Sequence, residues 1–369
     1  LVGSERCIRD RYRARLILRR FIPKAGGKER PLGLPVTEDK VLQTAVAKIL
    51  EAIYEPDFLN CSFGYRPKIS AKDAVKDVSR QLQFGNFNYI VEADIRSFFD
   101  SIDHDKLLDM LKIRIDDRKF LNLIRKWLKA GIFEKDGTII NPETGTPQGG
   151  IVSPILANIY LHYVLDGWFE NDVRQHCQGR VYLCRYADDF VCAFQNERDA
   201  GRFYKVLGKR LEKFGLSLAE EKTKMFRFSK WHRQDHNRFD FLGFEFRWGL
   251  SRKLRPQVKV RTSRKKYRAA LVSINIWCKK HRHLKVTVLF RKLNAKLRGY
   301  YNYYGVIGNF KSLSCYFYHT VKYLFKWVNR RSQRKSYTWE GFNELMKFFR
   351  IEKPRITEKK KQRQFTIFN

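Results

Sequence analysis

The hydrophobic positions near the start of the chain follow first a strand pattern and then a helix pattern. Residues 16–23 form a short apolar run that ends at a proline, and a double-glycine turn separates it from residues 30–34. Two such runs joined by a turn predict a β-hairpin. Over 37–53 the apolar residues recur at helical spacing, and Thr37 precedes two acids, as the N-cap residue of a helix does. A second helix is predicted over 70–84.

The middle of the chain alternates between helices and short buried strands. Residues 88–95 are an apolar run bounded by turn residues, and 179–195 read as two strands joined by a tight turn at Ala187–Asp188. Residues 145–153 are rich in Gly and Pro and predict a loop. A strand pair is expected to end near Phe246. The helices predicted in this part of the chain cover residues 104–114, 117–131, 154–175 and 197–214.

The last third of the chain is helical in pattern and strongly basic. Three helices are predicted, over 262–281, 286–304 and 311–332, and residues 248–257 are the expected linker before them. The whole chain has a net charge of +37, and residues 251–369 hold 32 basic and 4 acidic residues. Between Arg247 and Trp339 there is no acid at all. Such a segment repels itself unless it lies against a polyanion, so we expect nucleic acid as the partner.

Composition excludes several other classes of protein. With 43% hydrophobic residues the chain can bury a core and is no disordered tail. It lacks the ~20 consecutive apolar residues that a membrane-spanning helix needs, so we expect no membrane partner. Seven cysteines without a CxxC pair favour reduced thiols, hence a cytoplasmic location, and argue against a zinc finger.

Three acids lie where apolar strands end. Asp188 and Asp189 are adjacent in the predicted hairpin turn, and Asp94 ends the strand over 88–95. Like charges side by side are costly unless a cation neutralises them, and clustered carboxylates can hold two Mg²⁺ ions for phosphoryl transfer. For the Asp188–Asp189 pair alone, an ordinary turn is an equally good interpretation.

Seven sequence boxes, in order over about 225 residues, resemble those of group II intron reverse transcriptases. The tetrapeptide Tyr186-Ala187-Asp188-Asp189 is similar to that family's YADD box, and one such string alone would be weak. The remaining boxes are Ile22-Pro23-Lys24 with Arg30-Pro31-Leu32-Gly33-Leu34-Pro35, Cys61-Ser62-Phe63-Gly64-Tyr65-Arg66-Pro67, Asp94 through His104, Thr146-Pro147-Gln148-Gly149-Gly150, Glu221-Lys222-Thr223, and Phe241-Leu242-Gly243-Phe244.

The resemblance implies roles for residues in these boxes. Asp94, Asp188 and Asp189 would be the metal carboxylates, with Asp94 and Asp188 as direct ligands and the Ile95 carbonyl as a further oxygen. Two Mg²⁺ ions are the implied cofactors. Lys222 resembles the lysine that protonates the pyrophosphate leaving group, although an isolated lysine at a charged helix end is as often a plain surface residue.

Other boxes imply contacts with nucleotide and nucleic acid. Lys24 and Arg30 would neutralise the incoming triphosphate, Gln148 would contact the nucleotide, and Phe99 would exclude a 2′-hydroxyl. For Phe99 the plain alternative is a core phenylalanine. The remaining implied residues are the primer grip Phe241, Leu242, Gly243 and Phe244, and a nucleic-acid surface of Arg298, Tyr300, Tyr301, Tyr303 and Tyr304.

The resemblance also implies an α+β right-hand polymerase fold, with an antiparallel palm sheet backed by helices. Residues 1–87 would form fingers, 88–250 the palm with part of the fingers, 251–350 the thumb or maturase domain, and 351–369 a basic tail. The implied partners are an RNA template, a DNA primer, their duplex, structured intron RNA and deoxynucleoside triphosphates. The location would be bacterial cytoplasm or an organelle.

Two alternatives to an active RNA-directed DNA polymerase stay open at this stage. One is an RNA-binding splicing factor, or maturase, in which polymerisation is secondary or lost. The other is an inactive fragment, because few residues precede the first box and we expect an N-terminal truncation. We also expect the HNH nuclease domain of some relatives to be absent, since no Cys pairs or HNH-like histidines follow the basic region.

Overall fold

The structure is a computed structural model of the 369-residue chain, and it describes residues 12–23, 29–147, 149–232, 237–331 and 336–358. The chain divides into two compact units. The first comprises Leu1–Ser70 and Gly85–Ser229, and the second comprises Ala71–Phe84 and Lys230–Asn369. The division at Ser229 differs from the expected linker over 248–257, and the helix predicted over 70–84 belongs to the second unit.

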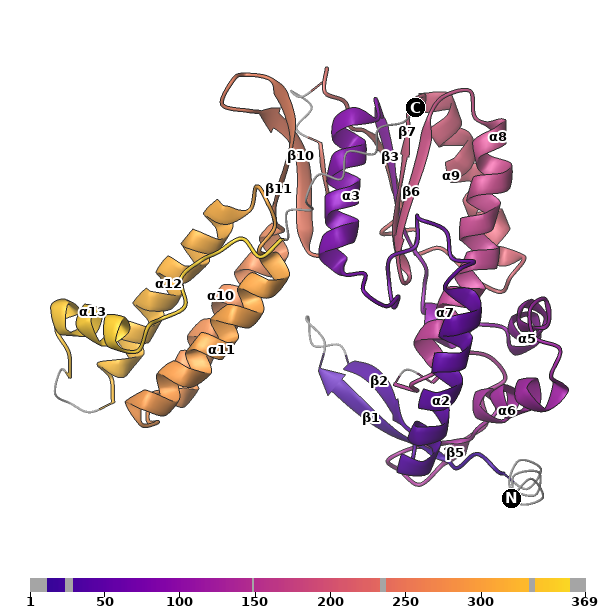
Figure 1. Cartoon of the computed structure of the whole chain (residues 1–369), viewed down its shortest axis with the longest axis horizontal. Helices are drawn as coiled ribbons and strands as arrows, with labels where there is room; N and C mark the ends of the chain where they lie inside the picture. The colour runs from indigo at the N-terminus through magenta and orange to yellow at the C-terminus, as the bar shows by residue number, and fades with distance from the viewer. Residues whose placement is uncertain (1–11, 24–28, 148, 233–236, 332–335, 359–369) are drawn as a thin grey trace. The chain divides into compact units, whose positions relative to one another are not determined.

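Among its described residues, the first unit contains two β-sheets and the helices that pack on them (Figure 1). Its strands are β1 (Ile17–Pro23), β2 (Glu29–Leu34), β3 (Tyr89–Asp94), β4 (Ile132–Phe133), β5 (Ile139–Ile140), β6 (Val181–Tyr186), β7 (Asp189–Phe194) and β8 (Lys224–Arg227). Its helices are α2 (Thr37–Tyr54), α4 (Phe98–Ser101), α5 (His104–Lys112), α6 (Arg118–Leu128), α7 (Ser153–Leu161), η1 (His162–Asp166), η2 (Phe169–Val173), α8 (Arg174–His176) and α9 (Glu197–Glu212).

The sheet that carries the predicted acids has the strand order β6-β7-β3-β8, and each pairing is antiparallel. β3 and β7 are buried along most of their length, as the continuous apolar runs predicted. Helix α9 contacts β3, β7 and β8, and its buried Phe203 lies 5.2 Å from the ring of Phe194. This packing supports the strands whose ends bear the acids.

The other sheet of this unit begins with the predicted hairpin. β1 and β2 pair antiparallel, and β4 joins β1 in parallel. Helix α2 starts at Thr37, but the residue in the extended N-cap conformation is Val36, and no side chain caps the helix. The expectation that Thr37 is the N-cap is therefore wrong by one position. The acids of the first turn, Glu38 and Asp39, still favour the helix N-terminus electrostatically.

The helix predicted over 154–175 is interrupted by wider turns. α7 is followed by the π-helical segments η1 and η2 before the short α8. π-Helical turns are rare and change which residues share a helix face. Periodicity alone predicted a uniform helix here, because apolar residues occupy most positions of this segment.

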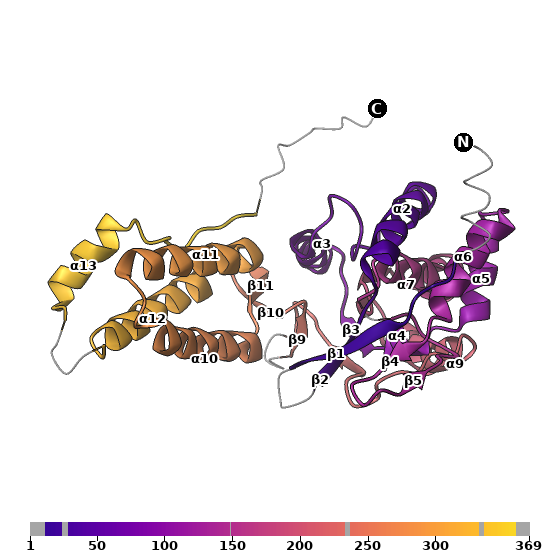
Figure 2. The same cartoon turned by 90° about the horizontal axis from the view of Figure 1, so that it is seen from below.

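The second unit combines one antiparallel sheet with a group of basic helices. Its strands are β9 (Arg238–Phe241), β10 (Phe244–Leu250) and β11 (Pro256–Thr262), in the order β11-β10-β9. Its helices are α3 (Ala71–Phe84), α10 (Arg264–His281), α11 (Val286–Tyr304), α12 (Phe310–Val328) and α13 (Trp339–Phe348). Figure 2 shows α10, α11 and α12 side by side, and α10 and α11 both contact α12.

The segment 248–257 is not a linker. It forms the end of the β10–β11 hairpin, in which Trp248 pairs with Val258 and Leu250 with Pro256. The exposed basic residues at the hairpin tip gave it the composition of a loop, whereas the short alternation of β11 was too weak to predict a strand. Helix α13 was not predicted either. Within the described residues, no helix is long and apolar enough to cross a membrane.

Candidate active site

A tight turn brings the two adjacent acids to the end of the β6–β7 hairpin. Ala187 has a φ of 57°, which reverses the chain between Tyr186 and Asp189, and those two residues pair across the hairpin. Asp189 also pairs with Asp94 of β3. Paired residues of antiparallel strands carry their side chains on the same face, so these two carboxylates are neighbours. The structure thus brings Asp94, Asp188 and Asp189 together, as predicted.

The three acids form a corner of the sheet where negative charges lie close together, and the pKa values of Asp188 and Lys222 are raised there. Burial raises the pKa of Asp188, and the nearby charge of Asp94 raises it further, while Arg30 and Lys222 act in the opposite direction. Lys222 forms an ion pair with Asp94, and this hydrogen bond raises the pKa of the lysine. Carboxylates in such surroundings favour a bound cation.

The donor set fits Mg²⁺ in part. Carboxylate oxygens are its preferred ligands, and Asp188 is a half-buried anion next to a second one. Within the described residues, however, no group of three His, Cys, Asp or Glu side chains is arranged to hold a metal ion. Mg²⁺ is commonly bound by one or two carboxylates with waters and substrate phosphates. The corner could therefore supply carboxylate ligands to Mg²⁺ without forming a complete three-carboxylate cage. The assignment of Asp94 and Asp188 as the direct ligands stays a prediction.

Lys222 is placed by a turn that is anchored to the same strand end. The backbone N–H of Ala219 donates to the Asp94 carbonyl at 2.8 Å, and the N–H of Lys222 donates to the Ala219 carbonyl at 2.9 Å. The exposed ammonium group therefore lies beside Asp94 rather than free in solvent. The predicted proton-donor role of Lys222 stays a prediction. The geometry adds a contact with Asp94 that the sequence did not reveal.

The loop that resembles the PQG box packs against β2. Gly149 has a φ of +113°, and a Cβ there would lie 2.5 Å from the carbonyl oxygen of Gly33, so only glycine fits. The Gln43 side chain of α2 accepts a hydrogen bond from the N–H of Ile151 at 2.9 Å. Two predicted nucleotide-binding residues, Gln148 and Lys24, lie outside the described residues.

Phe99 and Arg30 lie in the described part of this region. Phe99 is 7% exposed and meets Phe98 edge-on, with ring centroids 5.4 Å apart. Its carbonyl accepts a 2.7 Å hydrogen bond from the N–H of Thr146, just before the PQG box. Arg30 is exposed on β2, and its charge acts on Asp188. The role of Phe99 at the sugar stays a prediction, and its packing is that of a core residue.

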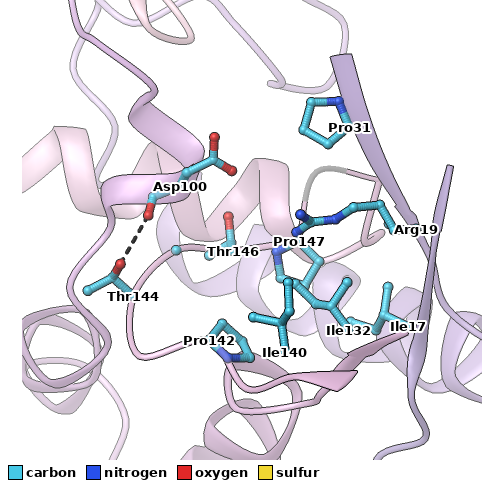
Figure 3. Close-up of a pocket in the computed structure, with 12 residues that line it drawn as sticks. Ile17, Arg19, Pro31, Asp100, Ile132, Ile140, Pro142, Thr144, Thr146 and Pro147 are labelled. Carbon is cyan, nitrogen blue, oxygen red and sulfur yellow. Dashed lines mark hydrogen bonds between the residues drawn. The ribbon is translucent and has the colours of Figure 1, made fainter. Parts of the chain in front are cut away.

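A cavity of about 270 Å³ lies beside the PQG loop. Figure 3 shows that the Arg19 guanidinium, the Asp100 carboxylate and the Thr146 hydroxyl surround it together with prolines and isoleucines. The Thr144 hydroxyl donates to the Asp100 carbonyl at 3.1 Å, which ties the loop to α4. Sequence reasoning assigned no role to this cavity.

The predicted primer grip is the turn of the β9–β10 hairpin in the second unit. Leu242 and Gly243 both have positive φ, 50° and 77°, as a two-residue hairpin turn requires. Phe244 is buried, and its ring stacks on Tyr303 at 6.0 Å. The Tyr303 hydroxyl donates to the Leu242 carbonyl at 3.0 Å. The turn is thus braced by α11.

The predicted nucleic-acid surface of α11 is only partly accessible in the structure. Tyr301 is 0% exposed and lies in the core of the second unit, so its prediction as a nucleic-acid contact is wrong. It shares a helix face with Leu293 and Leu297, four positions apart, which points it inward. Tyr300 and Tyr304 are half-buried, and Tyr300 stacks on Tyr316 at 3.8 Å. Arg298 is exposed and paired with Glu352.

A buried network behind the acids was missed from the sequence. Arg185, one residue before the YADD box, is 0% exposed and forms an ion pair with Asp166. An arginine inside an otherwise apolar strand was the signal that could have marked it, because charges are rarely buried without a partner.

A sheet of antiparallel strands that presents clustered carboxylates at a hairpin turn is the palm of a nucleic-acid polymerase fold. Residues 22–246 match the family described as reverse transcriptase (RNA-dependent DNA polymerase), and residues 265–344 match the group II intron, maturase-specific domain. The chain belongs to the reverse transcriptase family.

Two curated relatives illustrate the match. The group II intron-encoded protein LtrA of Lactococcus lactis subsp. cremoris is 30% identical over 397 residues, with 85% of this chain and 64% of LtrA covered. Protein YkfC of Escherichia coli K12 is 37% identical over 199 residues, with 46% of this chain and 52% of YkfC covered. The chain thus spans less than two thirds of the length of either relative.

Solved structures show the same fold at low sequence identity. Telomerase from Candida albicans, in complex with the TWJ fragment of telomeric RNA, matches with a TM-score of 0.53 and 13% identity, covering 93% of this chain and 64% of that chain. Apo telomerase from Candida tropicalis matches with a TM-score of 0.53 and 14% identity, covering 91% and 62%. The predicted α+β polymerase fold is confirmed.

Proposed function

We propose that this chain is an RNA-directed DNA polymerase of group II intron type, which extends a DNA primer on an RNA template. The observation that carries the proposal is the corner where Asp94, Asp188 and Asp189 meet on the palm sheet. Membership of the reverse transcriptase family supports the reaction class. Three clustered acids would be a costly feature in a protein that only binds RNA.

The chain's own residues divide the work of nucleotide addition. Asp94 and Asp188 would hold divalent metal, which when bound activates the primer hydroxyl and stabilises charge on the phosphates. Arg30, exposed on β2, supplies a charge-assisted fork for the triphosphate. Lys222 offers a proton donor beside Asp94. Phe99 would restrict the sugar to a deoxyribose.

Primer extension tests this function. A DNA primer annealed to an RNA template is incubated with deoxynucleotides and Mg²⁺, with wild type, Asp188→Ala and the control Asp109→Asn. Asp109 is an exposed acid of the same unit, paired only with Lys112 among the described contacts. We expect extension by wild type and by the control, and none by Asp188→Ala. Equal incorporation by all three proteins would refute the function.

A second function, assistance of intron splicing, is favoured by the match of residues 265–344 to the maturase-specific domain. The helices of this region offer a surface suited to structured RNA. Trp327 is surrounded by four cations, each 5.4–5.7 Å from its ring: Lys279, Arg282, Lys326 and Arg330. Cations grouped around an aromatic ring suit RNA phosphates and unstacked bases.

Splicing of the cognate intron at low Mg²⁺, with and without the protein, tests this second function. If Asp188→Ala retains splicing assistance and loses primer extension, both activities belong to one chain and use different units. If the wild type gives no acceleration, the maturase function is refuted. Bacterial cytoplasm or an organelle remains the predicted location.

A further inference from the structure

Arg185 is the centre of a completely buried hydrogen-bond network in the first unit. Its guanidinium donates two bonds to the Asp166 carboxylate, at 2.7 Å and 2.5 Å. It also donates to the Asn158 side chain at 2.9 Å and to the Ser62 hydroxyl at 2.7 Å. A fifth bond, of 3.1 Å, goes to the backbone carbonyl of Ala187. That carbonyl belongs to the turn that presents Asp188.

The backbone around Arg185 connects the same segments. Its N–H donates to the Cys61 carbonyl at 2.7 Å, and its carbonyl accepts from the N–H of Phe63 at 2.8 Å. Gly64 then lies directly against the turn, because a Cβ there would be 2.3 Å from the backbone nitrogen of Ala187. The turn is therefore contacted both by the Arg185 side chain and by Gly64, and residues 61–63 are themselves bonded to Arg185.

The π-helical turn explains how two helix residues reach one guanidinium. In an α-helix with about 3.6 residues per turn, positions eight apart are offset by about 80° around the axis. Asn158 lies in α7 and Asp166 ends η1, whose wider i→i+5 turns reduce that offset. Both side chains therefore face Arg185. π-Helical turns are frequent at functional sites.

Stability alone does not account for a charge pair in this position. Burial lowers the pKa of Arg185, but the carboxylate of Asp166 more than compensates, so the guanidinium stays charged. Well-packed apolar residues in place of a buried pair are often neutral or stabilising. What apolar side chains cannot supply is a donor for the Ala187 carbonyl together with three other acceptors in fixed directions.

We propose that Arg185 is a positioning residue for catalysis, which fixes the turn at Ala187 and thereby the place of Asp188 and Asp189. Asp166 and Asn158 orient its guanidinium. The effect on catalysis rests on the proposed polymerase function. The ordering of the turn by Arg185 does not depend on that function.

The double variant Arg185→Met/Asp166→Leu tests the proposal, because it removes both charges at once and keeps an apolar interior. Arg210→Met is the matched control. Arg210 is a partly buried arginine, whereas Arg185 is fully buried; it donates to two backbone carbonyls of η1, those of Val164 and Tyr163, and not to the turn. Measurements are the thermal midpoint, the Kd for RNA, kcat and KM for deoxynucleotide, and amide hydrogen exchange of a peptide that includes Ala187–Asp189.

We expect the double variant to bind RNA as wild type does, to lose at least ~10-fold in kcat with a KM changed by less than ~2-fold, and to exchange the turn amides at least ~10-fold faster. The control should change neither kcat nor exchange at the turn. If the turn amides of the double variant exchange at the wild-type rate, or if its kcat is unchanged, the proposal is overturned. If the wild type itself incorporates no nucleotide, the polymerase function fails, and the exchange result still decides whether Arg185 orders the turn.

Arg185→Lys keeps the test decisive if the double variant does not fold. Lysine retains the charge opposite Asp166 but cannot reach four acceptors in the directions of a guanidinium. We expect it to fold, with kcat reduced and turn exchange accelerated, each by ~3-fold or more. Full kcat with wild-type exchange would overturn the proposal.

Discussion

The two units of this chain use charge in opposite ways. In the first unit, several charges in the interior and beside the acids are held in ion pairs: Arg185 with Asp166, Lys222 with Asp94, and Arg66 with Glu55. In the second unit, the stretch between Arg247 and Trp339 holds no acid, and cations gather around aromatic rings. Catalysis requires a few charges at defined points, whereas binding of a polyanion requires many charges whose exact places matter less. Substitutions should therefore affect the rate of nucleotide addition in the first unit and the affinity for RNA in the second.

The largest effect is expected at the acids. Asp188→Asn should lower primer extension at least ~1,000-fold, since a neutral amide lacks the negative charge that attracts Mg²⁺, while the Kd for RNA stays within ~2-fold. Because burial disfavours this carboxylate, the thermal midpoint should also rise slightly. Single-turnover incorporation and filter binding measure the two activities. A large loss of RNA affinity would show that the division between the units is wrong.

A single substitution in the buried pair should destabilise the first unit strongly. Arg185→Met alone leaves Asp166 buried without a partner, and such losses typically cost about 3–5 kcal/mol. Adding Asp166→Leu removes the unpaired buried carboxylate and should recover most of that stability. Urea unfolding of both variants measures the difference. If the double variant is as unstable as the single one, the arginine is needed for folding itself.

Neutralising the Trp327 cluster should weaken binding without altering chemistry. With glutamine at Lys279, Arg282, Lys326 and Arg330, we expect RNA affinity to fall ~10–100-fold and the salt dependence to become shallower. At saturating template, kcat should not change. The matched control places glutamine at four exposed lysines of the first unit, Lys48, Lys129, Lys205 and Lys209. Equal losses in the two variants would mean that net charge, not this surface, determines affinity.

The smallest effect is expected at Arg298. Its exposed ion pair with Glu352 should contribute less than ~1 kcal/mol to stability. Arg298→Gln therefore separates a nucleic-acid role from a structural one. A Kd for RNA that rises ~3-fold, with an unchanged thermal midpoint, would support the predicted contact. An unchanged Kd would assign Arg298 to the pairing with Glu352 alone.

The elements with strong local patterns were predictable. The β1–β2 hairpin, helices α2 and α3, and the strand-turn-strand around Asp188 follow from periodicity and turn chemistry, which act over a few residues. The segment 248–257 was misinterpreted because basic, exposed residues look alike in a linker and at a hairpin tip. Tyr301 was misassigned because an aromatic run was interpreted by composition rather than by helical phase.

The sequence by itself determined the charge division, the order of the motif boxes and the identity of the acids at Asp94, Asp188 and Asp189. These depend on residue type and local spacing, which are visible along the chain. Only the tertiary structure decided that Lys222 meets Asp94, that Gly64 lies against the YADD turn, and that Asp166 and Asn158 converge on Arg185. Such contacts join residues 19 to 128 positions apart, so packing rather than local propensity sets them.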